Sequence, residues 1–184
     1  MSEKNSAVMG RPEVDSRFKL MVGYDVVVPR RYDHATCLEK FRKKYRKDFH
    51  HYNAGITDEN FGRATTRIAH GQRFHVEIFQ IKERLTSDEC ITFLHSQGAV
   101  LVGAQGATLM YEQYSKHLPK DQWMVSFDEK EALWKDGDSQ HKVPCICHAM
   151  GIRDDHPGTG FEFRLSRFDG DWHGGTCLFC FTTI

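Results

Sequence analysis

The sequence has no apolar run that approaches the roughly 20 residues of a membrane-spanning helix. Its first residues, Met-Ser-Glu-Lys-Asn-Ser, also lack the apolar segment of a secretory signal. Six cysteines in 184 residues are too few for the disulfide-dense scaffolds of small secreted domains, so we expect reduced thiols. Together these absences predict a cytoplasmic protein that has no membrane partner.

Net charge is absent as well, because 25 Lys and Arg balance 25 Asp and Glu. The charges are nevertheless distributed unevenly. Residues 1–85 contain 17 basic and 11 acidic side chains, whereas residues 86–184 contain 8 and 14. Such asymmetry is typical of a chain with one nucleic-acid-facing half. It equally fits two halves that attract each other across one core, or a dimer that packs head to tail.

A chain of 184 residues with 40% apolar residues can bury a stable core without disulfides. Residues 1–17 are polar and show no apolar period, so we expect a disordered leader there. Residues 18–184 should form a single globular domain, since no repeat, low-complexity tract or clear boundary interrupts them.

The apolar pattern predicts both strands and helices. Strands are expected at residues 20–28, 74–81, 99–102 and 123–127, and helices at residues 34–52, 86–97 and 103–118. The helix at 86–97 should begin at a capping box formed by Thr86 and Glu89, and should end at Gly98. The strands at 99–102 and 123–127, with the helix between them, should form a parallel, right-handed β-α-β unit.

The chain beyond residue 128 favours strands over helices. Segments 142–148, 161–167 and 176–182 are rich in β-forming residues, and turns that contain Gly, Asp or Pro separate them. We expect antiparallel hairpins here, with 161–167 paired to 176–182. The predicted fold class is therefore α/β to α+β, with a single mixed sheet, a parallel β-α-β unit in the middle and antiparallel hairpins at the C-terminal end.

The predicted helix at residues 34–52 carries the densest charge in the chain. Leu38, Phe41, Tyr45 and Phe49 fall on one of its faces, at core spacing. The cations that oppose or flank this face are Lys40, Arg42, Lys43, Lys44, Arg46 and Lys47. Clustered cations neutralise phosphates and release counterions, so these residues are candidates for binding nucleic acid or an acidic protein. The alternative is an ordinary solvated helix face.

Two cysteine pairs near the C-terminus have the short spacing that zinc sites use. They are Cys145-Ile-Cys147 and Cys177-Leu-Phe-Cys180. Strand alternation would place Cys145 and Cys147 on one face of a sheet, but Cys177 and Cys180 on opposite faces. We therefore favour buried packing of free thiols over a zinc site, and we expect no cofactor.

Other candidate sites rest on weaker patterns. Gly103-Ala-Gln-Gly106 lies between a predicted strand and a helix, where amides and the helix dipole favour an anion. It lacks the Lys and Ser/Thr of a P-loop, so a tight turn is the preferred interpretation. Carboxylates cluster in Asp128-Glu-Lys-Glu131 and in Asp169-Gly-Asp171-Trp-His173, where Asp-Gly indicates a hairpin turn. Catalytic motifs of the Gly-x-Ser-x-Gly or His-Glu-x-x-His kind are absent from the sequence.

Two functional hypotheses remain. The first is a non-catalytic binding module that uses the basic helix at 34–52 for nucleic acid or another polyanionic partner. The second is a small enzyme or a zinc-stabilised domain, built around residues 103–106 and the late Cys, His and Asp residues. We prefer the first, because its cations are dense and local, whereas the second requires distant residues to converge.

Overall fold

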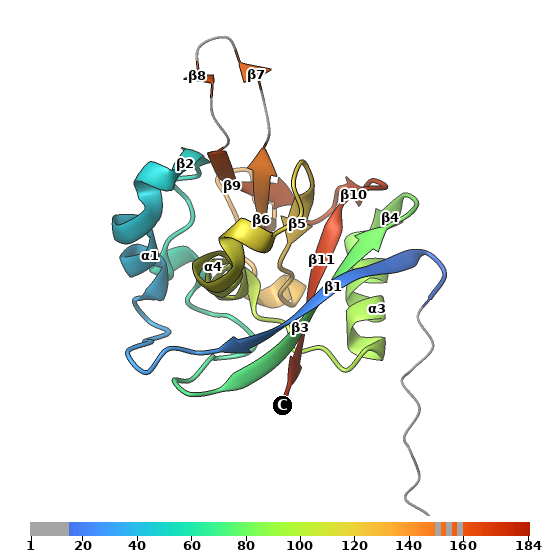
Figure 1. Cartoon of the computed structure of the whole chain (residues 1–184). Helices are drawn as coiled ribbons and strands as arrows, with labels where there is room; N and C mark the ends of the chain where they lie inside the picture. Colours follow the sequence, from blue (N-terminus) through green and yellow to red (C-terminus); the bar gives the residue numbers. More distant parts are fainter. Residues whose placement is uncertain (1–14, 150–151, 154–155, 158–159) are drawn as a thin grey trace, which may run out of the picture.

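The computed structural model describes residues 15–149, 152–153, 156–157 and 160–184 (Figure 1). A mixed sheet of seven strands runs in the order β1-β3-β11-β5-β6-β9-β2. Its strands are β1 (Phe18–Val27), β2 (Phe49–Tyr52), β3 (Arg73–Ile81), β5 (Trp123–Val125), β6 (Lys142–Ala149), β9 (Gly160–Arg167) and β11 (Cys177–Thr183). Two short ribbons pair β4 (Leu85–Thr86) with β10 (Asp171–Trp172) and β7 (Ile152–Arg153) with β8 (His156–Pro157). The expected mixed sheet is confirmed; most of the predicted leader lies outside the described residues.

Helices cover both faces of the sheet. They are α1 (Cys37–Tyr45), α2 (Asp58–Phe61), α3 (Ser87–Ser96) and α4 (Gly103–Tyr114), with 3-10 turns η1 (Arg46–Asp48), η2 (Ser115–His117) and η3 (Lys130–Ala132). Within the described part of the chain, none of these helices is both long and apolar enough to cross a membrane.

Strand alternation sends neighbouring side chains of β3 into two separate cores. Ile78 packs in a cluster with Phe41 of α1 and Met110 of α4. Its neighbour Phe79 packs in the other cluster, with Leu94 of α3. Because successive side chains of a strand point to opposite faces, the sheet is sandwiched between α1 and α4 on one side and α3 on the other, as Figure 1 shows.

The helix predicted at residues 86–97 is confirmed, together with the signals that define its ends. The Thr86 hydroxyl accepts a hydrogen bond from the Glu89 amide at 3.3 Å, and the Glu89 carboxylate accepts one from the Thr86 amide at 2.9 Å. Gly98 follows the helix with φ of +73°, a conformation that glycine adopts without steric strain.

The parallel β-α-β unit expected at residues 99–127 is wrong. Residues 99–102 do not form a strand: Val100 makes one isolated antiparallel bridge to Phe181, and α4 begins at Gly103. The strand β5 pairs parallel with β11 on one side and antiparallel with β6 on the other. Both of its edges are therefore occupied, so residues 99–102 have no free edge of β5 to join.

Antiparallel pairing at the C-terminal end is confirmed, but with different partners. The strands β6 and β9 form a hairpin in which Cys145 lies opposite Arg164. The expected pairing of residues 161–167 with 176–182 is wrong, because β9 lies between β6 and β2 while β11 lies between β3 and β5. β11 instead pairs antiparallel with β3, far earlier in the chain.

The helix expected at residues 34–52 is shorter than predicted. It ends at Tyr45, passes through η1, and the chain then enters β2, which pairs parallel with β9. Phe49 and Tyr52 are buried, but from a strand rather than a helix. A register shift between Phe49 and His51 lets side chains three positions apart both face the core, which imitates helical spacing.

Candidate functional site

The helix α1 carries a highly charged surface. The carboxylate of Asp58, from α2, accepts hydrogen bonds from the amides of Leu38 and Glu39, both at 2.9 Å, and so caps the first turn of α1. Leu38 and Phe41 are buried, and the Phe41 ring lies edge-on to Tyr111 of α4 at 5.4 Å. The apolar side of α1 is thereby fixed against α4, which leaves its charged side facing solvent.

All eight Lys and Arg between residues 30 and 47 are exposed. They form what we call the cationic surface: Arg30, Arg31, Lys40, Arg42, Lys43, Lys44, Arg46 and Lys47. The same segment contains only two acidic residues, Asp33 and Glu39. The candidates from the sequence are therefore all accessible to solvent, on a segment with a formal excess of six positive charges (eight minus two).

The ion pairs within this surface are local and open to solvent. Lys43 pairs with Glu39 at 2.8 Å across one helical turn, and Lys40 lies 3.8 Å from Asp33, with side chains at least half exposed in both pairs. The Lys43 ammonium lowers the pKa of Glu39, so that carboxylate stays ionised. Exposed pairs of this kind contribute little to stability, so their cations can exchange partners readily.

A pocket of about 210 Å³ lies beside the cationic surface, between α1 and α4. Cys37 and Tyr32 line it, together with Lys40, Lys44 and Glu112. Burial raises the pKa of the Cys37 thiol to about 11, and Tyr32 donates a hydrogen bond to its sulfur at 3.3 Å. At neutral pH the thiol is therefore protonated, which makes it a weak nucleophile.

The four cysteines considered for zinc do not converge. Cys145 and Cys180 belong to the core under α3, whereas Cys177 belongs to the core under α1 and α4. The predicted separation of Cys177 from Cys180 is confirmed. Burial raises the pKa of Cys145 and Cys177 to about 12 and that of Cys147 to about 11. Among the residues that the structure describes, no cluster of three or more His, Cys, Asp or Glu could hold a metal ion.

The glycine pair at residues 103–106 serves packing. All four residues are buried in the first turn of α4, so its amides do not face an open site. The buried carboxylate of Asp128 already lies beside this turn: a Cβ on Gly103 would be 3.0 Å from its Oδ2. Asp128 also accepts hydrogen bonds from the amides of Thr65 and Glu129, at 3.0 and 2.9 Å. The space beside this turn is thus filled by a side chain of the chain itself, although burial raises the pKa of Asp128.

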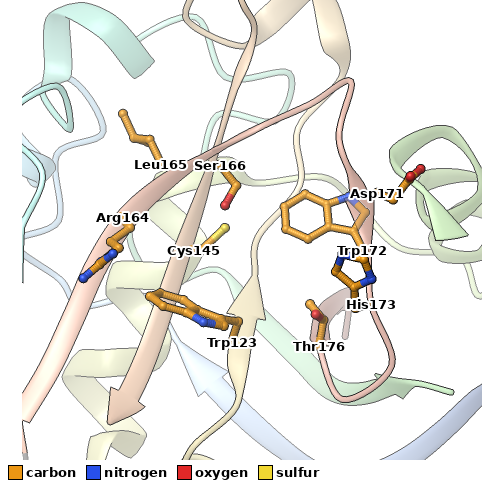
Figure 2. A pocket seen from close by; sticks show the side chains of 9 residues that line it. All are labelled: Trp123, Cys145, Arg164, Leu165, Ser166, Asp171, Trp172, His173 and Thr176. Carbon is orange, nitrogen blue, oxygen red and sulfur yellow. The ribbon is translucent and has the colours of Figure 1, made fainter. Parts of the chain in front are cut away.

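The late Cys, Asp and His residues do share a pocket. Cys145, Asp171 and His173 line a hollow of about 350 Å³ over β5, β6 and β9, on the α3 side of the sheet (Figure 2). The turn predicted at Asp169-Gly170 precedes β10 and brings Asp171 to this place. The predicted hairpin is wrong, because β10 pairs with β4 rather than with β9. The Cys145 side chain is almost fully buried, so it lies at the floor of the pocket.

Sequence reasoning missed the largest side chains of this pocket, Trp123, Arg164 and Trp172. Figure 2 shows the indoles of Trp123 and Trp172 on two sides of the hollow. Trp172 donates from its Nε1 to the Ser87 hydroxyl at 2.8 Å, which fixes the orientation of its ring. The sequence does show an aromatic residue at the end of a short strand. It does not show which strands lie side by side, and so it could not bring these residues together.

Comparisons of this chain with models of protein families, with curated proteins and with solved structures find no match. What the protein does must therefore be inferred from the chemistry of its own surfaces and pockets.

Proposed function

We propose that this protein is a non-catalytic, cytoplasmic binding module that holds nucleic acid on the cationic surface of α1. The observation that carries the proposal is the exposure of all eight cations between residues 30 and 47 beside only two acidic residues. A cytoplasmic location is part of the proposal, because the six cysteines are free thiols.

The arrangement of the cations favours a phosphate backbone over a single small anion. The charges lie along a helix and the turn after it, so they are spread over a length of chain that several phosphates could contact. Each Lys or Arg that neutralises a phosphate releases condensed counterions, which is the main source of non-specific affinity for nucleic acid. The Lys40 and Lys43 side chains are 62% and 74% exposed, so little dehydration opposes such contacts.

In the part of the chain that the structure describes, the acidic residues of the second half leave the cations of α1 exposed. The ion partners of Lys40 and Lys43 come from their own neighbourhood, Asp33 and Glu39. Glu112 of α4 lines the pocket that also contains Lys40 and Lys44, and burial raises the pKa of this carboxylate. The cations of α1 are thus available to an external partner.

The test is the double reversal Lys43→Glu and Lys47→Glu, assayed by binding of single-stranded RNA over a range of salt concentrations. We expect the affinity to be lost at moderate salt, and the slope of log affinity against log salt to fall by about 1.4, roughly 0.7 for each phosphate contact on a single strand. The melting temperature should hardly change, because exposed lysines contribute little to folding.

The matched control is the reversal Lys19→Glu and Lys82→Glu, which changes the net charge equally at two exposed positions near the β1 edge. This control should keep most of the RNA affinity. Equal losses in both variants would mean that net charge, rather than the cationic surface, governs binding. Absence of salt-dependent RNA binding by the natural protein would refute the proposal, and selective binding of an acidic protein would assign the surface to that partner.

A further inference from the structure

The pocket over β5, β6 and β9 has flat aromatic walls and a neutral interior. Trp123 is partly exposed at the start of β5. Trp172 is buried, and its indole is held by Ser87 and by edge-on packing against Phe127 at 5.5 Å. The guanidinium carbon of Arg164 lies 5.8 Å from the centroid of the Trp123 ring. These contacts give rigid surfaces against which a flat ligand can stack.

The formal charges around the pocket are already paired. Arg164 forms an ion pair with the buried Glu162 at 2.7 Å. Asp171 accepts hydrogen bonds from the guanidinium of Arg84, one of them at 2.7 Å. An anionic or cationic ligand would therefore meet no uncompensated charge from these groups.

The remaining polar groups are few and lie around the aromatic walls. Ser166 and Thr176 offer hydroxyl groups, and His173 offers an exposed imidazole. A planar ring with a few donors and acceptors at its edge needs only such a sparse set.

The size of the pocket fits a small ligand, and the residue at its floor is placed to contact that ligand rather than to react with it. A volume of about 350 Å³ is at the lower end of the roughly 300–1,000 Å³ typical of small-molecule sites. The floor is the Cys145 thiol, whose sulfur donates to the Val143 carbonyl at 3.5 Å and is almost inaccessible. This sulfur provides a soft, polarisable contact rather than a nucleophile.

We infer that this pocket binds a small uncharged molecule with a planar heteroaromatic ring, such as a nucleoside, stacked on the Trp123 indole. The site is separate from the cationic surface, because Cys145 and α1 lie on opposite faces of the sheet. A neutral ligand also gains little from the lysines of α1. The variant Lys43→Glu with Lys47→Glu should therefore bind the ligand as well as the natural protein does.

The experiment uses adenosine as the probe and equilibrium dialysis of the full chain as the measurement. We expect saturable binding of one adenosine per chain. Replacement Trp123→Ala should weaken it at least about fivefold, the lower limit for loss of one stacked base. Trp123→Phe, which keeps a flat ring, should retain most of the affinity. The chain has one further tryptophan, Trp134, which packs against Phe61 outside this pocket, so Trp134→Phe is the matched control and should bind normally.

Several results would overturn the inference. One is the absence of adenosine binding at millimolar concentration, and another is equal affinity in the natural protein and a folded Trp123→Ala variant. Binding of glucose but not adenosine would indicate a sugar site. Binding of adenosine monophosphate but not adenosine would locate the affinity in the phosphate. A Trp123→Phe variant as weak as Trp123→Ala would exclude stacking as the source of affinity.

Discussion

Replacement of Gly106 by alanine tests whether the glycine pair of α4 exists for close packing. A Cβ at this position would lie 2.3 Å from Cγ2 of Val102, 2.9 Å from Oγ of Ser126 and 3.0 Å from Cε2 of Phe181. These neighbours come from the residue before α4, the segment after β5 and strand β11, and each is 1% exposed. The methyl group therefore meets three fixed surfaces, with no open side toward which one of them could move.

Two opposing effects decide the size of the change. Alanine is favoured over glycine inside a helix by about 1 kcal/mol. Overpacking of a closed core disfavours the variant by about 1–3 kcal/mol, and three simultaneous contacts at or below 3.0 Å place this site toward the upper end. The net expectation is a loss of about 1–2 kcal/mol in the free energy of unfolding. For a chain of this length, such a loss lowers the melting temperature by about 2–8 °C.

Thermal and urea denaturation followed by circular dichroism would measure this loss. Gly137→Ala is the control, because a Cβ there meets nothing within 4 Å and the glycine does not have a positive φ. The control should be neutral or slightly stabilising, since alanine restricts the unfolded chain. A Gly106→Ala protein as stable as the natural one would refute the packing argument and reopen this turn as a candidate binding site.

Two further predictions concern acid sensitivity and helix capping. His34 accepts a hydrogen bond from the Ile68 amide at its Nδ1, and burial lowers its pKa below the ordinary 6.5, so the unfolded chain takes up a proton before the folded one does. The free energy of unfolding should therefore fall as the pH drops below about 6.5. It should fall less steeply in His34→Asn, whose amide oxygen can still accept the hydrogen bond from Ile68. If urea titrations gave both proteins the same dependence of stability on pH, this assignment would be wrong. Thr86→Ala should destabilise the protein by about 1 kcal/mol through loss of the helix cap. The control Thr92→Ala changes an exposed position of the same helix and should not destabilise it. Equal melting temperatures of the two variants would exclude the cap as a stabilising feature.

The parts of the fold that could be predicted from the sequence are those fixed by neighbouring residues. The helix α3 is an example, since Thr86, Glu89 and Gly98 satisfy its ends within a few positions of the chain. The alternation that separates Cys177 from Cys180 is another, because it depends only on the two-residue period of a strand. Neither feature requires knowledge of which other strand lies alongside.

Strand partners could not be predicted, because they depend on contacts between distant residues. The strand β11 pairs with β3, about 100 positions earlier, rather than with the preceding strand β9. Residues 99–102 have the apolar character of a buried strand, yet they lead into α4 because β5 has no free edge. In residues 49–52, apolar spacing fitted a helix and an irregular strand equally well, and pairing with β9 decided between them.

The two candidate sites also differ in whether the sequence alone could identify them. The cationic surface is contiguous in sequence, so its residues could be identified as a group before any fold was known. The tryptophan-lined pocket could not, since Trp123, Cys145 and Arg164 come from three strands whose adjacency is set by long-range register. The sequence drew attention to its cysteine, aspartate and histidine, but the aromatic walls that suggest a ligand emerged only in three dimensions.

The two sites lie on opposite sides of one sheet, and this separation shapes how they can act. A phosphate backbone held by the lysines of α1, as proposed, would lie on the side of the sheet that α1 and α4 cover. The pocket instead opens on the side that contains Cys145 and Val125. The interactions at the two sites also differ in kind, because counterion release weakens with salt and stacking of a neutral ring does not. A ligand whose affinity is insensitive to salt but sensitive to Trp123 therefore belongs to the pocket. One that responds to salt and to Lys43 belongs to α1, and each proposal can fail without the other.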